Sequence, residues 1–219
     1  LTDRDIYQYL LPRPRNAHKG TFGTVLLVAG SGNYPGAVLL AGMGAYRIGA
    51  GLVKIAVPEL IFSSLIGALI EATWIRLPHD MGWINKEANQ IITEALHGAS
   101  ALLLGPGMGL EKTTRFFLDG LIHQELPKTV IDADGIKLLA EIPDWYSILN
   151  EQVVLTPHPG EMAVLTGLSR EQIQSNRIDV VEKYARQWRK VVVLKGAYTV
   201  IAEPGGSTAI VPVATSALA

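Results

Sequence analysis

Cysteine is absent from this 219-residue chain, and charged residues make up only 18% of it. The missing thiols exclude disulfide bonds, thiolate metal ligands and cysteine nucleophiles. The formal net charge of −1 gives no general attraction for polyanions, so we expect no nucleic-acid partner. The 48% of hydrophobic residues is typical of a compact globule, and the length suits a single domain.

A secretory signal and a membrane span are lacking as well. The N-terminal sequence LTDRDIYQYLLPRPR has no basic-then-apolar pattern. The apolar stretch 36–53 carries Arg47 and several glycines, which argues against insertion into a bilayer. We therefore expect a cytoplasmic protein with no membrane partner. The chain begins with Leu rather than Met, which leaves open a segment before it.

Apolar runs rich in β-branched residues recur along the chain, with helical patterns between them. They cover residues 24–30, 52–58, 101–105, 129–134, 153–157 and 191–196. Several lack in–out alternation, which predicts strands buried on both faces of a parallel sheet. Right-handed crossovers then place helices on both faces, giving a three-layer α/β/α sandwich with a mostly parallel central sheet. Residues 199–204 and 208–213 flank two glycines and predict a final antiparallel hairpin.

Two helix starts are marked by capping residues. Asn85 is an N-cap candidate for a helix over 86–97. Ser169 and Gln172 form a capping-box pattern, which predicts a helix that continues as far as Tyr184.

Four unusual loops follow predicted strands, at 31–36, 106–109, 157–161 and 195–196. Ligands of open α/β sheets bind beyond the carboxyl ends of the strands, so these loops would share the functional edge. Their glycines permit close backbone approach, and helix N-termini attract phosphate. Each loop alone is an ordinary tight turn. Four on one edge, with a histidine and a lysine among them, favour a ligand site.

Four titratable residues at the ends of predicted strands each allow two interpretations. His158 lies between Pro157 and Pro159, which restrict its backbone, so it either caps a helix or points its ring at a ligand. Lys195 is a solvated cation or a point charge for a phosphoryl group. Asp132 and Asp134 start a helix through Asx-type turns or help to hold Mg²⁺ through water.

Several motifs occur together, in the order HKGTFG (18–23), GAVLLAG (36–42), GAGL (49–52), GPGMG (105–109), DADG (132–135), TPHPGE (156–161) and LKGAYTVIA (194–202). From Pro14 to its end, the chain closely resembles the ADP- or ATP-dependent NAD(P)H-hydrate dehydratase family. The resemblance implies a ribokinase-like fold and the repair of hydrated NADH or NADPH (NADHX and NADPHX). In that reaction a nucleotide phosphorylates the hydrate's hydroxyl and phosphate is then eliminated, with Mg²⁺ accompanying the nucleotide.

The resemblance also implies roles for particular residues. Ala37, Gly109 and His158 correspond to the hydrate-binding set, so His158 becomes a substrate-positioning group; proton transfer by it stays open. The adenine nucleotide would be held by the segment Lys195, Gly196, Ala197, Tyr198 and Thr199.

One departure from the family pattern concerns the C-terminal residues. The family continues into a glycine-rich turn that ends in Gly-Asp, whose amides form an anion hole and whose aspartate acts as base. This sequence has Ala214-Thr215-Ser216 where Thr-Gly-Asn often precedes that turn, and it stops at Ala219. No catalytic residue is therefore assigned within the chain, the metal ligands stay unknown, and the 219 residues are expected to be inactive on their own.

Two other functions stay open. One is a small-molecule kinase of the same fold, which would stop at a phosphate ester. The other is a non-catalytic nucleotide-binding domain. The sequence does not decide between ADP and ATP, or between NADHX and NADPHX. It also leaves open a homo-oligomer and an upstream NAD(P)H-hydrate epimerase domain.

Overall fold

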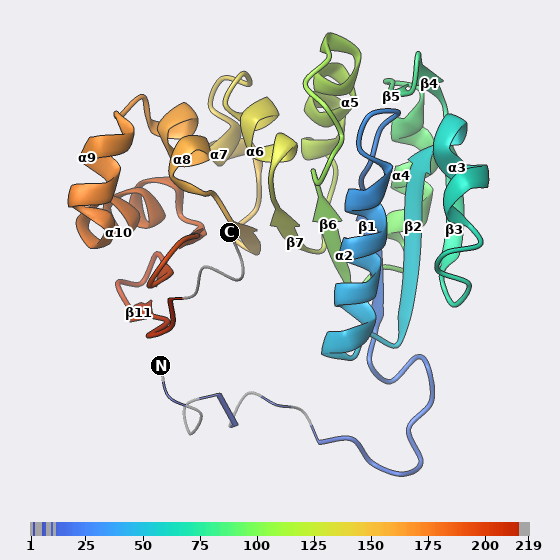
Figure 1. Cartoon of the computed structure of the whole chain (residues 1–219), viewed down its shortest axis with the longest axis horizontal. Coiled ribbons are helices and arrows are strands. Elements are labelled where there is room, and N and C mark those ends of the chain that lie inside the picture. The colour runs from blue at the N-terminus through green and yellow to red at the C-terminus, as the bar shows by residue number, and fades with distance from the viewer. Residues whose placement is uncertain (1, 3–5, 8–9, 11, 215–219) are drawn as a thin grey trace.

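A nine-stranded sheet forms the centre of the computed structural model, which describes residues 2, 6–7, 10 and 12–214 (Figure 1). The strand order is β11-β10-β9-β8-β7-β6-β1-β2-β3. The strands are β1 (Thr24–Val28), β2 (Leu52–Pro58), β3 (Thr73–Leu77), β6 (Ala101–Leu104), β7 (Lys128–Ile131), β8 (Val153–Leu155), β9 (Val191–Leu194), β10 (Val200–Ala202) and β11 (Thr208–Ile210). Pairing is parallel from β3 to β9 and antiparallel at β9–β10 and β10–β11.

The strand order reverses direction at β1. From β1 the chain adds β2 and β3 on one side, then crosses back and continues through β6 to β9 on the other. Val28 at the end of β1 is in register with Leu104 at the end of β6. In doubly wound sheets a crevice opens at such a switch point, outside the carboxyl ends of the two strands. The fold therefore places the loops after β1 and β6 at its natural ligand site.

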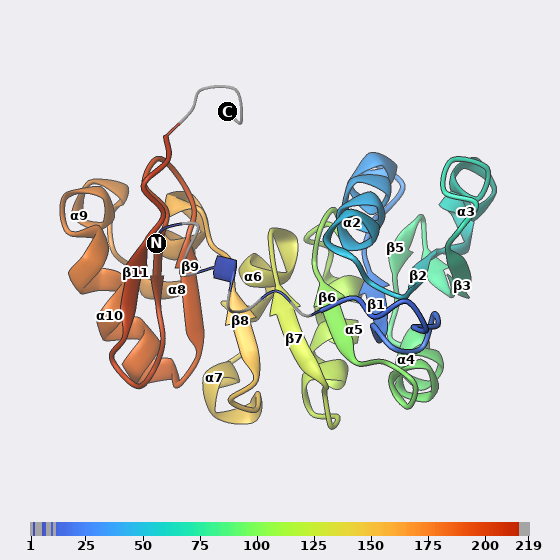
Figure 2. The same cartoon turned by 90° about the horizontal axis from the view of Figure 1, so that it is seen from below.

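Helices cover the two faces of the sheet unequally (Figure 2). One face carries α2 (Pro35–Ile48) and α3 (Glu59–Leu65) over β1 and β2. The other face carries α4 (Ala88–Leu96), α5 (Lys112–Ile122), α6 (Asp134–Leu139), α7 (Trp145–Ile148), α8 (Pro159–Thr166), α9 (Arg170–Ser175) and α10 (Arg177–Trp188). The larger hydrophobic core lies between these seven helices and the sheet, and the smaller one lies beneath α2 and α3.

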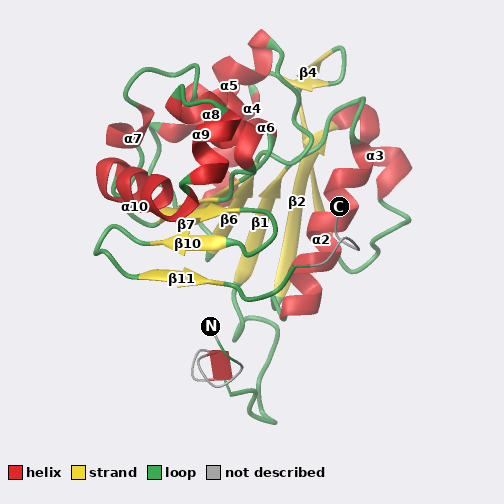
Figure 3. Ribbon diagram, turned by 60° about the vertical axis from the view of Figure 1, so that its left-hand side comes forward, coloured by secondary structure: helices red, strands yellow, loops and turns green. Residues whose placement is uncertain are grey.

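Beyond β6, the face that carries α2 and α3 has no helix from the described residues. Val130, Val154, Val193 and Ile201 point to this side in neighbouring strands, and each keeps partial exposure. Figure 3 shows β10 and β11 at this end of the sheet, away from α2 and α3. The predicted sandwich and its final hairpin are confirmed, with the second helical layer restricted to one half of the sheet. Within the described residues, we also find no helix whose length and apolar character would let it cross a bilayer.

Three local features differ from the sequence-based expectations. β3 and the small hairpin of β4 (His79–Asp80) and β5 (Trp83–Ile84) were not predicted. The capping box at Ser169 is present, but its helix stops at Ser175, because Asn176 leaves helical geometry with φ −134° before α10 begins. Helix α4 starts at Ala88 rather than at residue 86, and Asn85 Oδ1 accepts a hydrogen bond from Glu87 N at 3.2 Å in the preceding turn.

Candidate active site

The loops after β1 and β6 contact each other at the switch point. Gly30 N donates a hydrogen bond to the Pro106 carbonyl at 2.8 Å. Gly107 has φ +67°, and a methyl group there would come within 3.0 Å of the Ala37 side chain. Ala37 and the GPGMG loop thus lie side by side, as their common position after parallel strands predicts.

The GPGMG loop is bonded in turn to the DADG segment after β7. Gly109 N donates to Asp134 Oδ2 at 3.0 Å, and Lys137 Nζ donates to Asp134 Oδ1 at 3.0 Å. Gly105 has φ +121° and lies directly against the Asp132 carbonyl and the backbone of Gly135, so no side chain fits there. The DADG segment is therefore held by Lys137 of α6 and by the backbone of the GPGMG loop.

Ala133 has a backbone conformation that non-glycine residues rarely adopt, with φ 52° and ψ −120°. Such a conformation costs about 1–3 kcal/mol and persists only where surrounding contacts impose it. Here Asp132 and Asp134 on either side are fixed by bonds to different partners. We attribute the strained backbone at Ala133 to the different partners that bind the Asp132 and Asp134 carboxylates.

We expect Ala133→Gly to raise the free energy of unfolding by about 1 kcal/mol, because glycine relieves this strain at a smaller entropic cost. Urea denaturation measures the change. Ala140→Gly is the matched control, since Ala140 has ordinary helical angles, φ −60° and ψ −20°, and should lose about 0.5–1 kcal/mol. Equal losses in both variants would contradict the strain interpretation.

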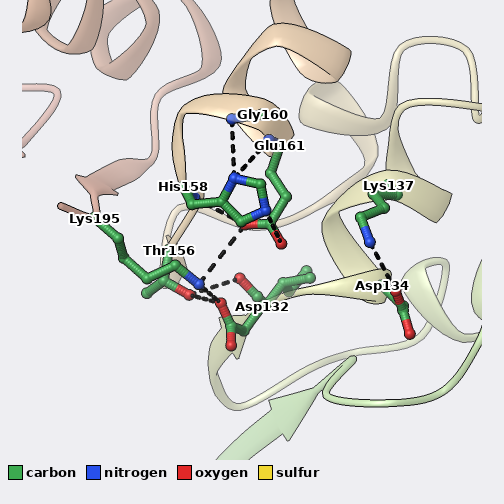
Figure 4. A network of polar contacts seen from close by, with 9 residues as sticks. Asp132, Asp134, Lys137, Thr156, His158, Gly160, Glu161 and Lys195 are labelled. Atoms are coloured by element: carbon green, nitrogen blue, oxygen red, sulfur yellow. Dashed lines mark hydrogen bonds and ion pairs between the residues drawn. The ribbon is translucent and has the colours of Figure 1, made fainter. Parts of the chain in front are cut away.

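A charged cluster lies at the ends of β8 and β9 (Figure 4). Lys195 Nζ lies 2.5 Å from Asp132 Oδ1 and 3.7 Å from Glu161 Oε2. Thr156 Oγ1 donates to the same Asp132 oxygen at 2.7 Å. The Lys195 amide donates to the Pro157 carbonyl at 2.9 Å, which ties the loops after β8 and β9 together. Glu161 is almost fully buried, with 3% of its surface exposed, so its charge needs this lysine nearby.

His158 is the N-cap residue of α8, with Pro159 in the first helical turn. Its Nδ1 accepts hydrogen bonds from Gly160 N at 2.9 Å and Glu161 N at 3.4 Å, and its own amide donates to Glu161 Oε2 at 2.8 Å. The capping interpretation is thus confirmed. Because Nδ1 acts as an acceptor, a neutral ring carries its proton on Nε2, which lies 3.3 Å from Glu161 Oε1. The side chain is half-exposed, so the ring also remains open to a ligand.

The segment 195–199 leaves β9 in a tight turn, with φ 135° at Gly196 and 54° at Tyr198. Arg177 supports it, because Nη2 donates to the Leu194 carbonyl at 3.0 Å and to the Lys195 carbonyl at 3.3 Å. Burial lowers the pKa of the Arg177 guanidinium. An open hollow of about 430 Å³ lies beside this turn, lined by Gln174, Ser175, Asn176, Arg177, Ile178, Asp179, Ala197, Tyr198, Val200 and Ile210.

Contacts between successive loops therefore connect the predicted site residues. Ala37 adjoins the GPGMG loop, whose Gly109 binds Asp134; the DADG segment binds Lys195 through Asp132; and Lys195 neighbours Glu161, which faces His158. We predict that these residues line one continuous cleft. Among the described residues there is no group of three or more histidine, aspartate or glutamate side chains that could hold a metal alone. Thr215 and Ser216, singled out in the sequence, lie outside the described residues.

Four residues of this region were given no site role from the sequence. Thr156 and Glu161 occur in the TPHPGE motif, which could have indicated them, whereas Trp83 and Arg177 belong to no motif. Two recognised motifs lie elsewhere. HKGTFG (18–23) precedes β1 and GAGL (49–52) precedes β2, and Leu52 N donates to the Gly23 carbonyl at 3.1 Å. Both motifs therefore lie where these strands begin, at the opposite ends of the strands from the predicted site loops.

The mostly parallel sheet, with its switch point at β1 and helices on both faces, is ribokinase-like. One similar solved structure, a ribokinase-like superfamily protein from Enterococcus faecalis, has a TM-score of 0.78 and 25% identity over 94% of this chain and 69% of its own. The family model for NAD(P)H-hydrate dehydratase matches residues 25–219. The chain belongs to the NAD(P)H-hydrate dehydratase family.

Individual relatives agree with this assignment. The ADP-dependent (S)-NAD(P)H-hydrate dehydratase of Bacillus subtilis is 35% identical over 218 residues, covering 100% of this chain and 74% of the relative. A crystal structure of the Bacillus subtilis ADP/ATP-dependent enzyme, co-crystallised with ATP and Mg²⁺, has a TM-score of 0.80 and 34% identity over 99% of this chain and 73% of its own. The bifunctional NAD(P)H-hydrate repair enzyme Nnr of Moorella thermoacetica is 37% identical over 94% of this chain, which spans only 39% of that relative.

Proposed function

We propose that this protein is a nucleotide-dependent NAD(P)H-hydrate dehydratase that returns NADHX and NADPHX to NADH and NADPH. The observation that supports the proposal is the cluster of Lys195, Asp132, Glu161 and His158, in which a cation and a histidine contact the same buried carboxylate. The cluster lies at the carboxyl ends of β8 and β9, the edge where open α/β sheets bind ligands. The name of the Bacillus subtilis relative supports the substrate and favours ADP as the nucleotide.

The reaction has two steps. The hydroxyl oxygen of the hydrate attacks the terminal phosphorus of the nucleotide and gives up its proton to a base, and the bond from that phosphorus to the leaving nucleotide breaks. A base then takes a proton from the carbon next to the phosphorylated one. The electron pair of the broken C–H bond forms the ring double bond, while the carbon–oxygen bond breaks and phosphate leaves with its electrons. Lys195 would stabilise the phosphoryl charge, and the His158 Nε2–H would donate a hydrogen bond to the hydrate.

A nucleotide-borne Mg²⁺ is part of the proposal, since the Bacillus subtilis structure was co-crystallised with ATP and Mg²⁺. The donor set fits such a shared ion, because Asp132 uses only Oδ1 for Lys195 and Thr156 and leaves Oδ2 available. Asp132 would reach the ion directly or through water, while Asp134 remains bonded to Gly109 and Lys137. The ion would offset phosphate charge.

Turnover of purified hydrate by the full native chain tests the proposal. We expect the absorbance of reduced nicotinamide to return only when ADP or ATP is added. A stable phosphate ester without this absorbance would instead support the small-molecule kinase. Nucleotide binding without any product would support a non-catalytic domain.

The extent of the active unit is also proposed. We propose that residues 1–219 belong to one dehydratase domain, and that the anion-hole turn and the catalytic aspartate of the family are supplied by residues not among these 219. A polypeptide of residues 1–219 should then bind ligand and show no turnover, while a longer chain from the same gene should be active. Equal rates would contradict this, and Asp132→Asn and Asp134→Asn would become the variants to measure. An upstream epimerase domain, a homo-oligomer and a cytoplasmic location also stay predictions.

Replacing His158 separates its two roles. His158→Ala should weaken hydrate binding by about 1–3 kcal/mol through the lost polar contact, and should lower the free energy of unfolding by about 1 kcal/mol through the lost cap. His158→Asn is the matched variant, because asparagine is a strong N-cap residue but lacks the Nε2–H donor. It should keep the stability and lose the binding. Titration calorimetry measures the hydrate affinity, and urea denaturation measures the free energy of unfolding. If both variants keep the wild-type hydrate affinity, His158 serves only as the N-cap of α8.

A further inference from the structure

The β4–β5 hairpin lies beside the switch-point loops rather than in the main sheet. Its turn residues Met81 and Gly82 have φ 51° and 91°, the pattern of the tight turn that joins two short antiparallel strands. Gly32 N, in the loop after β1, donates to the Gly82 carbonyl at 3.0 Å. The hairpin is thus fixed to the first glycine-rich loop and does not hang free in solvent.

Trp83 of this hairpin packs its indole against Gly109. A Cβ atom at Gly109 would overlap the six-membered ring of the indole, and the φ of +80° at Gly109 further restricts this position to glycine. Trp83 belongs to neither hydrophobic core cluster and keeps partial exposure, unlike the core residues Trp145 and Trp188. Its indole therefore packs on the backbone of a proposed hydrate-binding residue, and the residue as a whole stays partly exposed.

A second aromatic residue flanks the same loop. Tyr34 is 54% exposed, and a Cβ atom at Gly107 would come within 2.8 Å of the Tyr34 side chain. Because the Gly109 amide is bonded to Asp134, the Gly109 carbonyl is the group this residue can offer to a ligand. The GPGMG loop thus has the Trp83 ring against Gly109 and the Cβ atom of Tyr34 against Gly107.

We infer that Trp83 determines specificity in the hydrate site, as the wall against which the hydrated nicotinamide ring packs. The inference rests on the proposed function. The hydrated ring keeps a conjugated, planar amide portion whose faces are apolar and whose carboxamide donates hydrogen bonds. An aromatic face beside a carbonyl acceptor suits both features. Trp83 also limits where Gly109 can lie. Replacing Trp83 should therefore weaken the packing around the ring of the hydrate and leave the segment 195–199 unchanged.

The test compares Trp83→Ala and Trp83→Phe in the full native chain, with Trp74→Phe as the control. Trp74 lies in β3, and its ring packs edge-to-face against Phe62 with the ring centroids 6.3 Å apart. We expect Trp83→Ala to raise KM for the hydrate about tenfold, with KM for the nucleotide changed less than about twofold. Trp83→Phe should recover most of the loss, and Trp74→Phe should change neither constant.

Calorimetric titration with the hydrate alone separates this inference from the proposed function. If the wild-type chain shows no nucleotide-dependent turnover, the proposed function fails, and weaker hydrate binding by Trp83→Ala alone would still support the inference. If turnover is present and Trp83→Ala keeps the wild-type KM for the hydrate, the inference is overturned. Equal increases in both KM values, with no recovery in Trp83→Phe, would make Trp83 a merely structural residue and would also overturn it.

Discussion

Replacing Lys195 by methionine should lower nucleotide-dependent formation of NAD(P)H by about 10²–10³-fold, because stabilisation of developing charge is usually the largest catalytic contribution. Methionine keeps much of the side chain's length and removes its charge. The loss should fall on kcat and on KM for the nucleotide, whereas KM for the hydrate should change little. Steady-state kinetics with each substrate varied in turn measures the three constants.

Lys128→Met is the matched control, because Lys128 is an exposed residue at the start of β7, at the other end of that strand from the Lys195 cluster. It should retain activity within about threefold, as an exposed charge contributes little. Lys195→Met also leaves Asp132 and the buried Glu161 without their cation, so its stability must be measured. Adding Asp132→Asn should recover part of the stability and none of the activity. A Lys195→Met enzyme within tenfold of wild type would refute the phosphoryl role.

Gly105→Ala should be the most destabilising of the single substitutions considered, by about 3–4 kcal/mol or more. Its φ of +121° is a conformation that L side chains rarely adopt, and the new methyl group would overlap the Asp132 carbonyl and the backbone of Gly135. Either the loop after β6 or the DADG segment must move, and both contribute to the site. Urea denaturation measures the loss.

Gly44→Ala provides the control for the Gly105 substitution. Gly44 lies inside α2. Apart from its chain neighbours and the backbone of the helix itself, no atom lies within 4 Å of the position that a methyl group would take there. Alanine should therefore raise the free energy of unfolding by about 0.5–1 kcal/mol. A Gly105→Ala protein with the wild-type urea midpoint would contradict the close packing described at this loop.

The strands were predictable because their β-branched runs carry a local signal. The run at 52–58 coincides with β2, and the final hairpin followed from two glycines between short runs. β3 was missed because its sequence TWIRL mixes polar and apolar residues and only Leu77 is fully buried. The break between α9 and α10 was missed because a local helical pattern continues through Asn176, while the chain itself turns there.

The sequence indicated which loops lie at one edge of the sheet, and it did not indicate the hydrogen bonds and contacts that join them. Family motifs indicated His158, Gly109 and Lys195, and the strand-end rule placed their loops on one edge. The bond between Lys195 and Asp132 joins residues 63 positions apart, so no local sequence pattern predicts it. The same holds for Trp83 against Gly109, because the hairpin that carries Trp83 reaches the loop only through the folded sheet.

We expect Glu161 to link the binding of the two proposed substrates, because its carboxylate contacts both Lys195 and His158. A phosphate group that draws the Lys195 ammonium away would leave the Glu161 carboxylate with only the backbone amide and the Nε2–H of His158 among the contacts described above. Occupancy at one end of the cluster then changes the free energy of binding at the other. Such coupling is reciprocal, so the factor by which nucleotide changes hydrate affinity equals the factor by which hydrate changes nucleotide affinity. The pair of ligands would bind this chain as interdependent partners, whichever of them arrives first.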